Sequence, residues 1–130
     1  YQEAAGTAID LQPVIDQARA LEDSLARFYD SAQQSATRSI SDPGVRHINE
    51  TQRRLARVLV PINYTRAGRF RHDPAIDVPP LPDLEPATRI ASLAQDSDAY
   101  RITRTHLARG RNRVVAALRE ARRILEDAQP

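Results

Sequence analysis

Apolar residues recur every three or four positions over three long stretches of the chain, which is the spacing of one face of an α-helix. The first stretch predicts a helix over residues 11–37, with Asp10 as its N-cap. Residues 1–9 show no such period, and we expect them to form an extended lead-in. The neighbouring rings of Phe28 and Tyr29 lie near the end of this helix, where we expect both to pack in the core.

A second helix is predicted over residues 43–60. Asp42 can cap it, and Pro43 suits its first position because the fixed φ of proline is already helical. Its apolar positions share one side, while arginines and a glutamate occupy the other. Pro61 should end this helix, since proline lacks the N–H that a helix interior needs.

The last third of the chain predicts a short helix followed by a long one. The short helix opens at Glu85 and Pro86 and extends to Ala94. Acidic and serine residues at 96–98 break it and supply the cap for a final helix over residues 98–128.

Gly110 interrupts the apolar stripe of this final helix. Glycine costs about 1 kcal/mol relative to alanine in an exposed helix interior. A glycine at this position therefore favours the close approach of another backbone segment, and we expect Gly110 to lie in a tight contact.

Three long helices and one short helix predict an all-α fold, an up-and-down helical bundle of about four helices with one long Pro-rich loop. The length of 130 residues suits a single helical domain, residues 1–130. The loop spans residues 61–84 and holds five of the nine prolines. Loops beyond about 12 to 15 residues are usually functional or disordered, and apolar residues spaced along this one favour an ordered functional loop.

Composition removes several kinds of chemistry. Without cysteine the chain has no disulfide, thiol nucleophile or thiolate metal site. Its basic residues are all arginine, and a net charge of only +2 argues weakly against binding to nucleic acid. No run approaches the roughly 18 apolar residues of a membrane span, so we expect no membrane contact by this segment. The chain begins at Tyr1 rather than Met, and we expect it to be the C-terminal fragment of a larger protein.

Neither a metal centre nor a catalytic site is visible in the sequence. His47, His72 and His106 have none of the spacings of metal ligands, so we expect no metal in this chain. The serines lie outside any Gly-x-Ser-x-Gly elbow, and the chain shows no constellation of nucleophile, base and oxyanion donors.

The sharpest charged feature is a cluster of three arginines and two aromatic rings in the loop. In one interpretation its forked guanidinium donors and rings contact an anionic ligand or RNA. In the other, which we prefer because the loop carries its own acids, the arginines pair with Asp73, Asp77, Asp83 and Glu85, or with another domain. The cluster consists of Tyr64, Arg66, Arg69, Phe70 and Arg71.

The order of motifs through this region resembles the transferrin-receptor-like dimerisation domain. In that family a helix ends at an apolar-x-Pro stretch, an aromatic-Arg-His triplet follows, and an apolar-Pro pair leads into the next helices. The corresponding residues here are 55–61, Phe70-Arg71-His72 and Leu81-Pro82. The resemblance covers most of the chain, including the capped first helix and the alanine-rich last one.

The resemblance implies that the parent is a bacterial-type glutamate carboxypeptidase-like zinc peptidase, periplasmic or secreted. This chain would be its non-catalytic helical domain, forming a homodimer and packing beside the protease domain of the same parent chain. The zinc ligands and catalytic glutamate of the family lie in that protease domain, so no cofactor belongs to this chain. The long loop would border the substrate pocket of the parent through Tyr64, Arg66 and Arg69.

The chain departs from the family in one segment. Carboxypeptidases that recognise a terminal glutamate carry a Lys-Tyr pair between the Arg-His motif and the apolar-Pro pair. This chain has the shorter segment DPAIDVPP there, so specificity for glutamate is not implied.

Two other classes of function stay open. One is a stand-alone helical module that binds an anionic ligand or RNA through the Arg66–Arg71 loop. The other is an enzyme in its own right, which the lack of a catalytic constellation disfavours. For the homodimer, we expect the contact surface on the helices predicted over residues 43–60 and 98–128.

Overall fold

The computed structural model describes residues 1–34, 43–64 and 81–128. In chain order its elements are α1 (Gln2–Ala5), α2 (Gln12–Gln34), α3 (Pro43–Tyr64), the 3₁₀ helix η1 (Pro82–Leu84), α4 (Ala87–Ile90) and α5 (Asp98–Ala128). The described ranges contain helices and no strand, which confirms the predicted all-α helical bundle.

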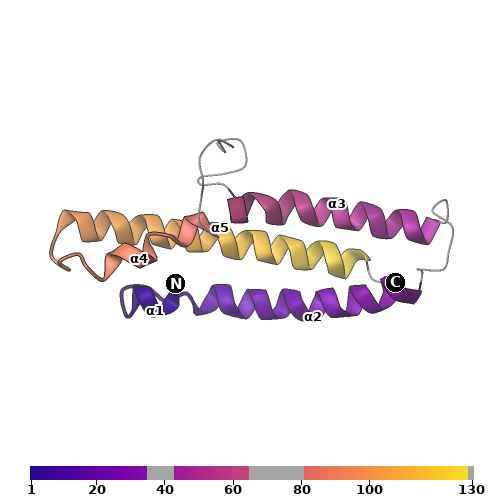
Figure 1. The fold of residues 1–130 in the computed structure, drawn as a ribbon, viewed down its shortest axis with the longest axis horizontal. Coiled ribbons are helices and arrows are strands. Elements are labelled where there is room, and N and C mark those ends of the chain that lie inside the picture. Colours follow the sequence, from indigo (N-terminus) through magenta and orange to yellow (C-terminus); the bar gives the residue numbers. More distant parts are fainter. Residues whose placement is uncertain (35–42, 65–80, 129–130) are drawn as a thin grey trace.

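The central element is α5. Figure 1 shows it running between α2 and α3, with α3 antiparallel to the other two long helices. Both α2 and α3 pack along α5, whereas they barely approach each other. The long helices thus have the predicted up-and-down order, but they form an open bundle whose outer members share one central neighbour.

The hydrophobic core follows one face of α5. On this face Leu107, Val114, Ala121 and Leu125 are completely buried. The facing helix α2 and the residue just before it contribute a stripe of buried residues at helical spacing, Leu11, Val14, Leu21, Ser24 and Phe28. Among the described side chains of α3, Thr51 and Leu55 are buried, and Ile48, Val58, Leu59 and Ile62 pack against the core while partly exposed.

The extended lead-in predicted for residues 1–9 is wrong, because its start folds into α1. The side chain of Gln2 accounts for the fold-back. Its amide nitrogen donates to the carbonyl of Ile9 at 3.3 Å, and its Oε1 accepts a hydrogen bond from the N–H of Leu11 at 2.5 Å. Ala5 is then buried where α1 packs on α4. These contacts are tertiary and leave no periodic signal in the sequence.

The prediction that Pro61 ends the second helix is also wrong, since α3 continues to Tyr64 with Pro61 inside it. Pro61 cannot donate to the carbonyl of Arg57, so one backbone bond of the last turns is lost. Ile62, one residue further on, packs partly against the core. We infer that this burial, near the end of the helix where few bonds remain, offsets the loss.

The predicted short helix ends earlier than expected. It stops at Ile90 rather than Ala94. After it, the N–H of Ser92 bonds to the carbonyl of Arg89 at 3.1 Å and that of Leu93 to the carbonyl of Ile90 at 3.2 Å. These bonds span three residues, so the chain tightens into turns instead of continuing the α-helix.

The starts of α2 and α5 are capped by polar side chains, as the sequence predicts. The Asp10 carboxylate accepts a hydrogen bond from the N–H of Gln12 at 2.8 Å. At the start of α5, Ser97 Oγ accepts one from the N–H of Tyr100 at 3.1 Å. Both caps satisfy N–H groups that have no partner within their helix, so they fix where α2 and α5 begin.

Candidate functional site

The structure brings three of the predicted site residues to one place. Tyr64 is the last residue of α3, and Leu81 and Pro82 begin η1. The other predicted site residues lie outside the described residues, namely Arg66, Arg69, Phe70, Arg71 and His72.

A hydrogen bond joins the residues on the two sides of positions 65–80. The N–H of Leu81 donates to the side-chain oxygen of Asn63 at 3.3 Å. Leu81 has φ 48° and ψ 62°, a left-handed conformation that is rare for residues other than glycine. The described residues on either side of positions 65–80 therefore lie close together, and one of them, Leu81, has a strained backbone.

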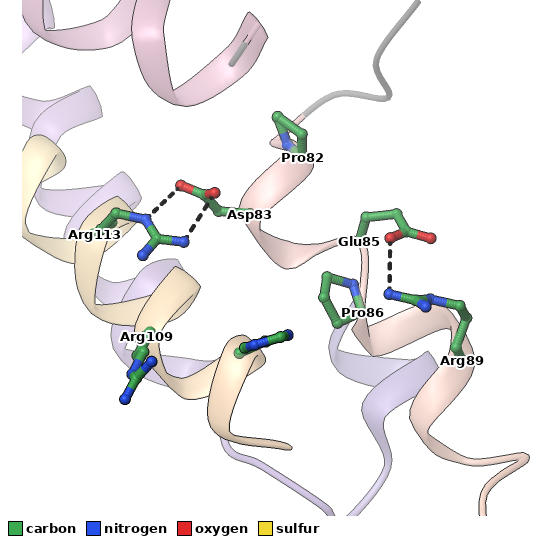
Figure 2. Close-up of a pocket in the computed structure, with 8 residues that line it drawn as sticks. Pro82, Asp83, Glu85, Pro86, Arg89, Arg109 and Arg113 are labelled. Atoms are coloured by element: carbon green, nitrogen blue, oxygen red, sulfur yellow. Dashed lines mark hydrogen bonds and ion pairs between the residues drawn. The ribbon is translucent and has the colours of Figure 1, made fainter. Parts of the chain in front are cut away.

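Asp83 fixes η1 to α5. Both of its carboxylate oxygens accept hydrogen bonds from Arg113, each at 3.0 Å, in the forked geometry that Figure 2 shows. The Asp83 side chain is 6% exposed and that of Arg113 is 45% exposed. Hydrogen bonding to Asp83 raises the pKa of Arg113, although burial opposes this in part. The ion pair thus joins the nearly buried side chain of Asp83 on η1 to the partly exposed Arg113 on α5.

Gly110 confirms the tight contact that the sequence predicts. A Cβ at this position would overlap the carbonyl oxygen of Asp83 and lie 2.9 Å from its carbonyl carbon. The backbone of η1 therefore rests directly on the backbone of α5. We call this arrangement the loop anchor, which consists of Asn63, Leu81, Asp83, Gly110 and Arg113.

A shallow pocket of about 320 Å³ opens beside the loop anchor, between η1, α4 and α5. Its walls include three arginines, but Arg113 is held by Asp83, and Arg89 binds Glu85 at 3.3 Å. Figure 2 shows Arg109 turned away from these two pairs. The guanidinium groups here are mainly used within the protein, so we assign no anion site to this pocket.

Several arginines of α5 hold other segments of the chain. Besides Arg113, two more reach across to main-chain carbonyls. Arg104 donates to Ala8 at 3.0 Å, and Arg111 to Asp10 at 3.3 Å. Within the loop anchor, Gly110 was the residue that the sequence indicated as a tight contact, and no pattern in the sequence pointed to Arg113 as the partner of Asp83.

Two of the four acids expected to pair with the loop arginines contact arginines outside the predicted cluster, since Asp83 binds Arg113 and Glu85 binds Arg89. The other two, Asp73 and Asp77, lie outside the described residues. The loop arginines themselves lie outside the described ranges.

A second feature, missed by the sequence analysis, is an apolar groove between α2 and α3. It has a volume of about 500 Å³ and is lined by Glu22, Leu25, Ala26, Phe28, Tyr29, Ala32, Gln52 and Leu55. We call it the α2–α3 groove. It exists because the two helices pack on α5 without closing on each other.

Tyr29 corrects one sequence prediction. Phe28 is buried as expected, but the ring of Tyr29 is 63% exposed on the rim of the groove. Leu25, one turn earlier, is 37% exposed on the same rim. The first helix thus carries two apolar stripes, one toward α5 and one along the groove. Amphipathic spacing alone does not separate them, since both were counted as core.

In the parts of the chain that the structure describes, no group of three or more His, Cys, Asp or Glu side chains could hold a metal ion. His47 lies at the surface, where its Nε2 donates to the carbonyl of Ala128 at 3.1 Å. His106 is exposed on α5.

Among the helices that the structure describes, none is both long and apolar enough to cross a membrane. A scan against protein-family models and searches of curated proteins and of solved structures each find no match for this chain.

Proposed function

We propose that this chain is a non-catalytic homodimerisation domain of a glutamate carboxypeptidase-like zinc peptidase. The observation that supports self-association is the α2–α3 groove, an apolar surface between two helices that the rest of the described chain leaves open. The sequence resemblance supports the kind of parent. The peptidase chemistry, with its zinc, would belong to the protease domain of that parent.

The groove has the composition of a protein–protein contact. An exposed tyrosine and leucine flank it, with small alanines between them and a single charged residue, Glu22, in its lining. Interface centres are typically enriched in aromatic residues and depleted of charge. Exposed apolar patches on soluble proteins commonly mark such sites. A second helical surface laid over the groove would bury these residues as a closed bundle does.

The loop anchor supports the second part of the proposal, in which residues 65–80 border the substrate pocket of the parent. Leu81 is hydrogen-bonded to Asn63, and Asp83 is paired with Arg113 on α5. Together these contacts would hold both ends of such a loop at a fixed place. Binding and catalytic residues are often carried on loops that a rigid scaffold positions. This domain would then contribute to the pocket without supplying a catalytic residue.

The proposal is tested first by light scattering on the 130-residue chain over a concentration series. We expect a mass approaching twice 14.6 kDa as concentration rises. Replacing both Leu25→Ala and Tyr29→Ala should raise the dissociation constant by about 30-fold, as loss of an aromatic interface anchor does. Both side chains are exposed in the single chain, so the variant should fold normally.

Ile102→Ala is the matched control, because Ile102 is a 57% exposed apolar residue on α5 outside the groove lining. It should leave the dissociation constant unchanged. A wild-type chain that stays monomeric at every concentration would remove self-association by this domain. Salt-dependent binding of such a monomer to RNA would instead support the helical module that uses Arg66–Arg71.

A further inference from the structure

Resting on the proposed homodimer, we propose how the two copies pair. The two-fold axis runs along the helices, so that α2 of one copy lies over α3 of the other and each copy covers the α2–α3 groove of its partner. The pairing follows from the shape of the open face and from the charges of the two helices that border it.

The open face allows only two simple isologous pairings with the helices aligned. If the axis lies along the helices, α2 meets the partner's α3, and the two run antiparallel because α2 and α3 are antiparallel within one copy. If the axis lies across the helices, α2 meets the partner's α2 and α3 meets the partner's α3. Both arrangements are closed and self-complementary.

Charge distinguishes these two pairings. Helix α2 carries four acids and two arginines, whereas α3 carries four arginines and one acid. An axis along the helices brings the acidic helix of each copy to the basic helix of the other, twice per dimer. An axis across them brings acidic to acidic and basic to basic. Since charges across an interface mainly select partner and register, the first pairing is favoured.

In this pairing, residues at the same height along the helix axes face each other across the interface. Ala26 and Tyr29 of α2 and Gln52 of α3 all line this one groove, and we take them to lie at about the same level along the bundle. Rotation about an axis along the helices keeps that level, so Ala26 faces Gln52 of the partner subunit. Tyr29 then enters the partner's groove beside it.

The lack of cysteine makes this contact easy to test, because an introduced thiol is the only one in the chain. We would prepare Ala26→Cys and Gln52→Cys as separate chains, one with a mass tag, mix them, and treat them with a short bismaleimide. Both positions line the open groove, so either substitution should be tolerated. Ala116→Cys, an exposed position on α5, controls for random collision.

We expect the mixed product of Ala26→Cys with Gln52→Cys to exceed either self-product and the Ala116→Cys control by at least about tenfold. Predominant self-linking of Ala26→Cys would overturn this pairing in favour of the axis across the helices. Dimers by light scattering that link at neither position would also overturn it, since the groove would then lie outside the contact. Both of these results leave the homodimer intact, whereas a monomer by light scattering overturns the homodimer itself.

Discussion

Gly110 shows at the scale of one residue how a contact can reverse an intrinsic preference. In an exposed helix, alanine is about 1 kcal/mol better than glycine. Here the place of a Cβ is occupied by the carbonyl of Asp83, which is main chain and cannot rotate away. The absence of a side chain at Gly110 is therefore what lets η1 dock on α5.

We expect Gly110→Ala to destabilise the protein by about 1–3 kcal/mol, the usual cost of forcing extra volume into a packed contact. Urea denaturation would measure the change. The exposed Ala116→Gly is the reverse control and should cost about 1 kcal/mol through helix propensity alone. A stabilised Gly110→Ala variant would show that η1 does not rest on α5 as described.

The tight contact at Gly110 could be predicted from the sequence, but its partner, the main chain of Asp83, could not. Periodicity identified α2, α3 and α5, and capping chemistry identified where α2 and α5 start. Neither signal could predict α1, because its position depends on the hydrogen bond that Gln2 accepts from the N–H of Leu11. Nor could it distinguish Phe28 from Tyr29, because which apolar stripe is covered depends on how the helices are placed around α5.

At the scale of elements, the docking of η1 depends on the Asp83–Arg113 pair. Removing one partner of a buried pair leaves an uncompensated charge, at a cost of about 3–5 kcal/mol for complete burial. Arg113 is nearly half exposed, so the cost here should be smaller. Because Asp83 raises the pKa of Arg113, the stabilisation is fully present below the ordinary arginine pKa and is lost only above it.

We expect Arg113→Ala to lower the free energy of unfolding by about 2 kcal/mol, and Arg113→Lys to recover part of this because lysine cannot form both bonds. Hydrogen exchange should speed up at the N–H of Leu84, which bonds to Leu81 within η1. The exposed Arg101–Asp98 pair supplies the control, since Arg101→Ala should cost less than about 1 kcal/mol. Equal effects at both positions would contradict a docking role for Arg113. The effect of Arg113→Ala should not change between neutral and mildly alkaline pH.

At the scale of the whole molecule, the open bundle concentrates opposite charges on its two outer helices. The small net charge of +2 hides this separation, because the acids of α2 and the arginines of α3 cancel in the total. Pairing of two copies through these helices should therefore depend on ionic strength in a direction that reports the geometry.

We expect the dimer to weaken several-fold as sodium chloride rises from about 0.05 M to about 0.5 M, because salt screens attraction between α2 and the partner's α3. Sedimentation equilibrium would measure the dissociation constants. Replacing Arg54→Gln and Arg57→Gln on α3 should flatten the dependence. A dimer that tightens with salt would indicate like charges across the contact and contradict the proposed axis.

The hydrogen bond from Leu81 to Asn63 has a consequence for how this chain can evolve. Once two ends of a segment are held together, lengthening the segment costs little, about 0.6 kcal/mol for each doubling. Insertions and substitutions between residues 64 and 81 can then accumulate while the helices that bear the anchor keep their packing. Related chains could therefore acquire new binding specificities between these two positions while the packing of the helices stays the same.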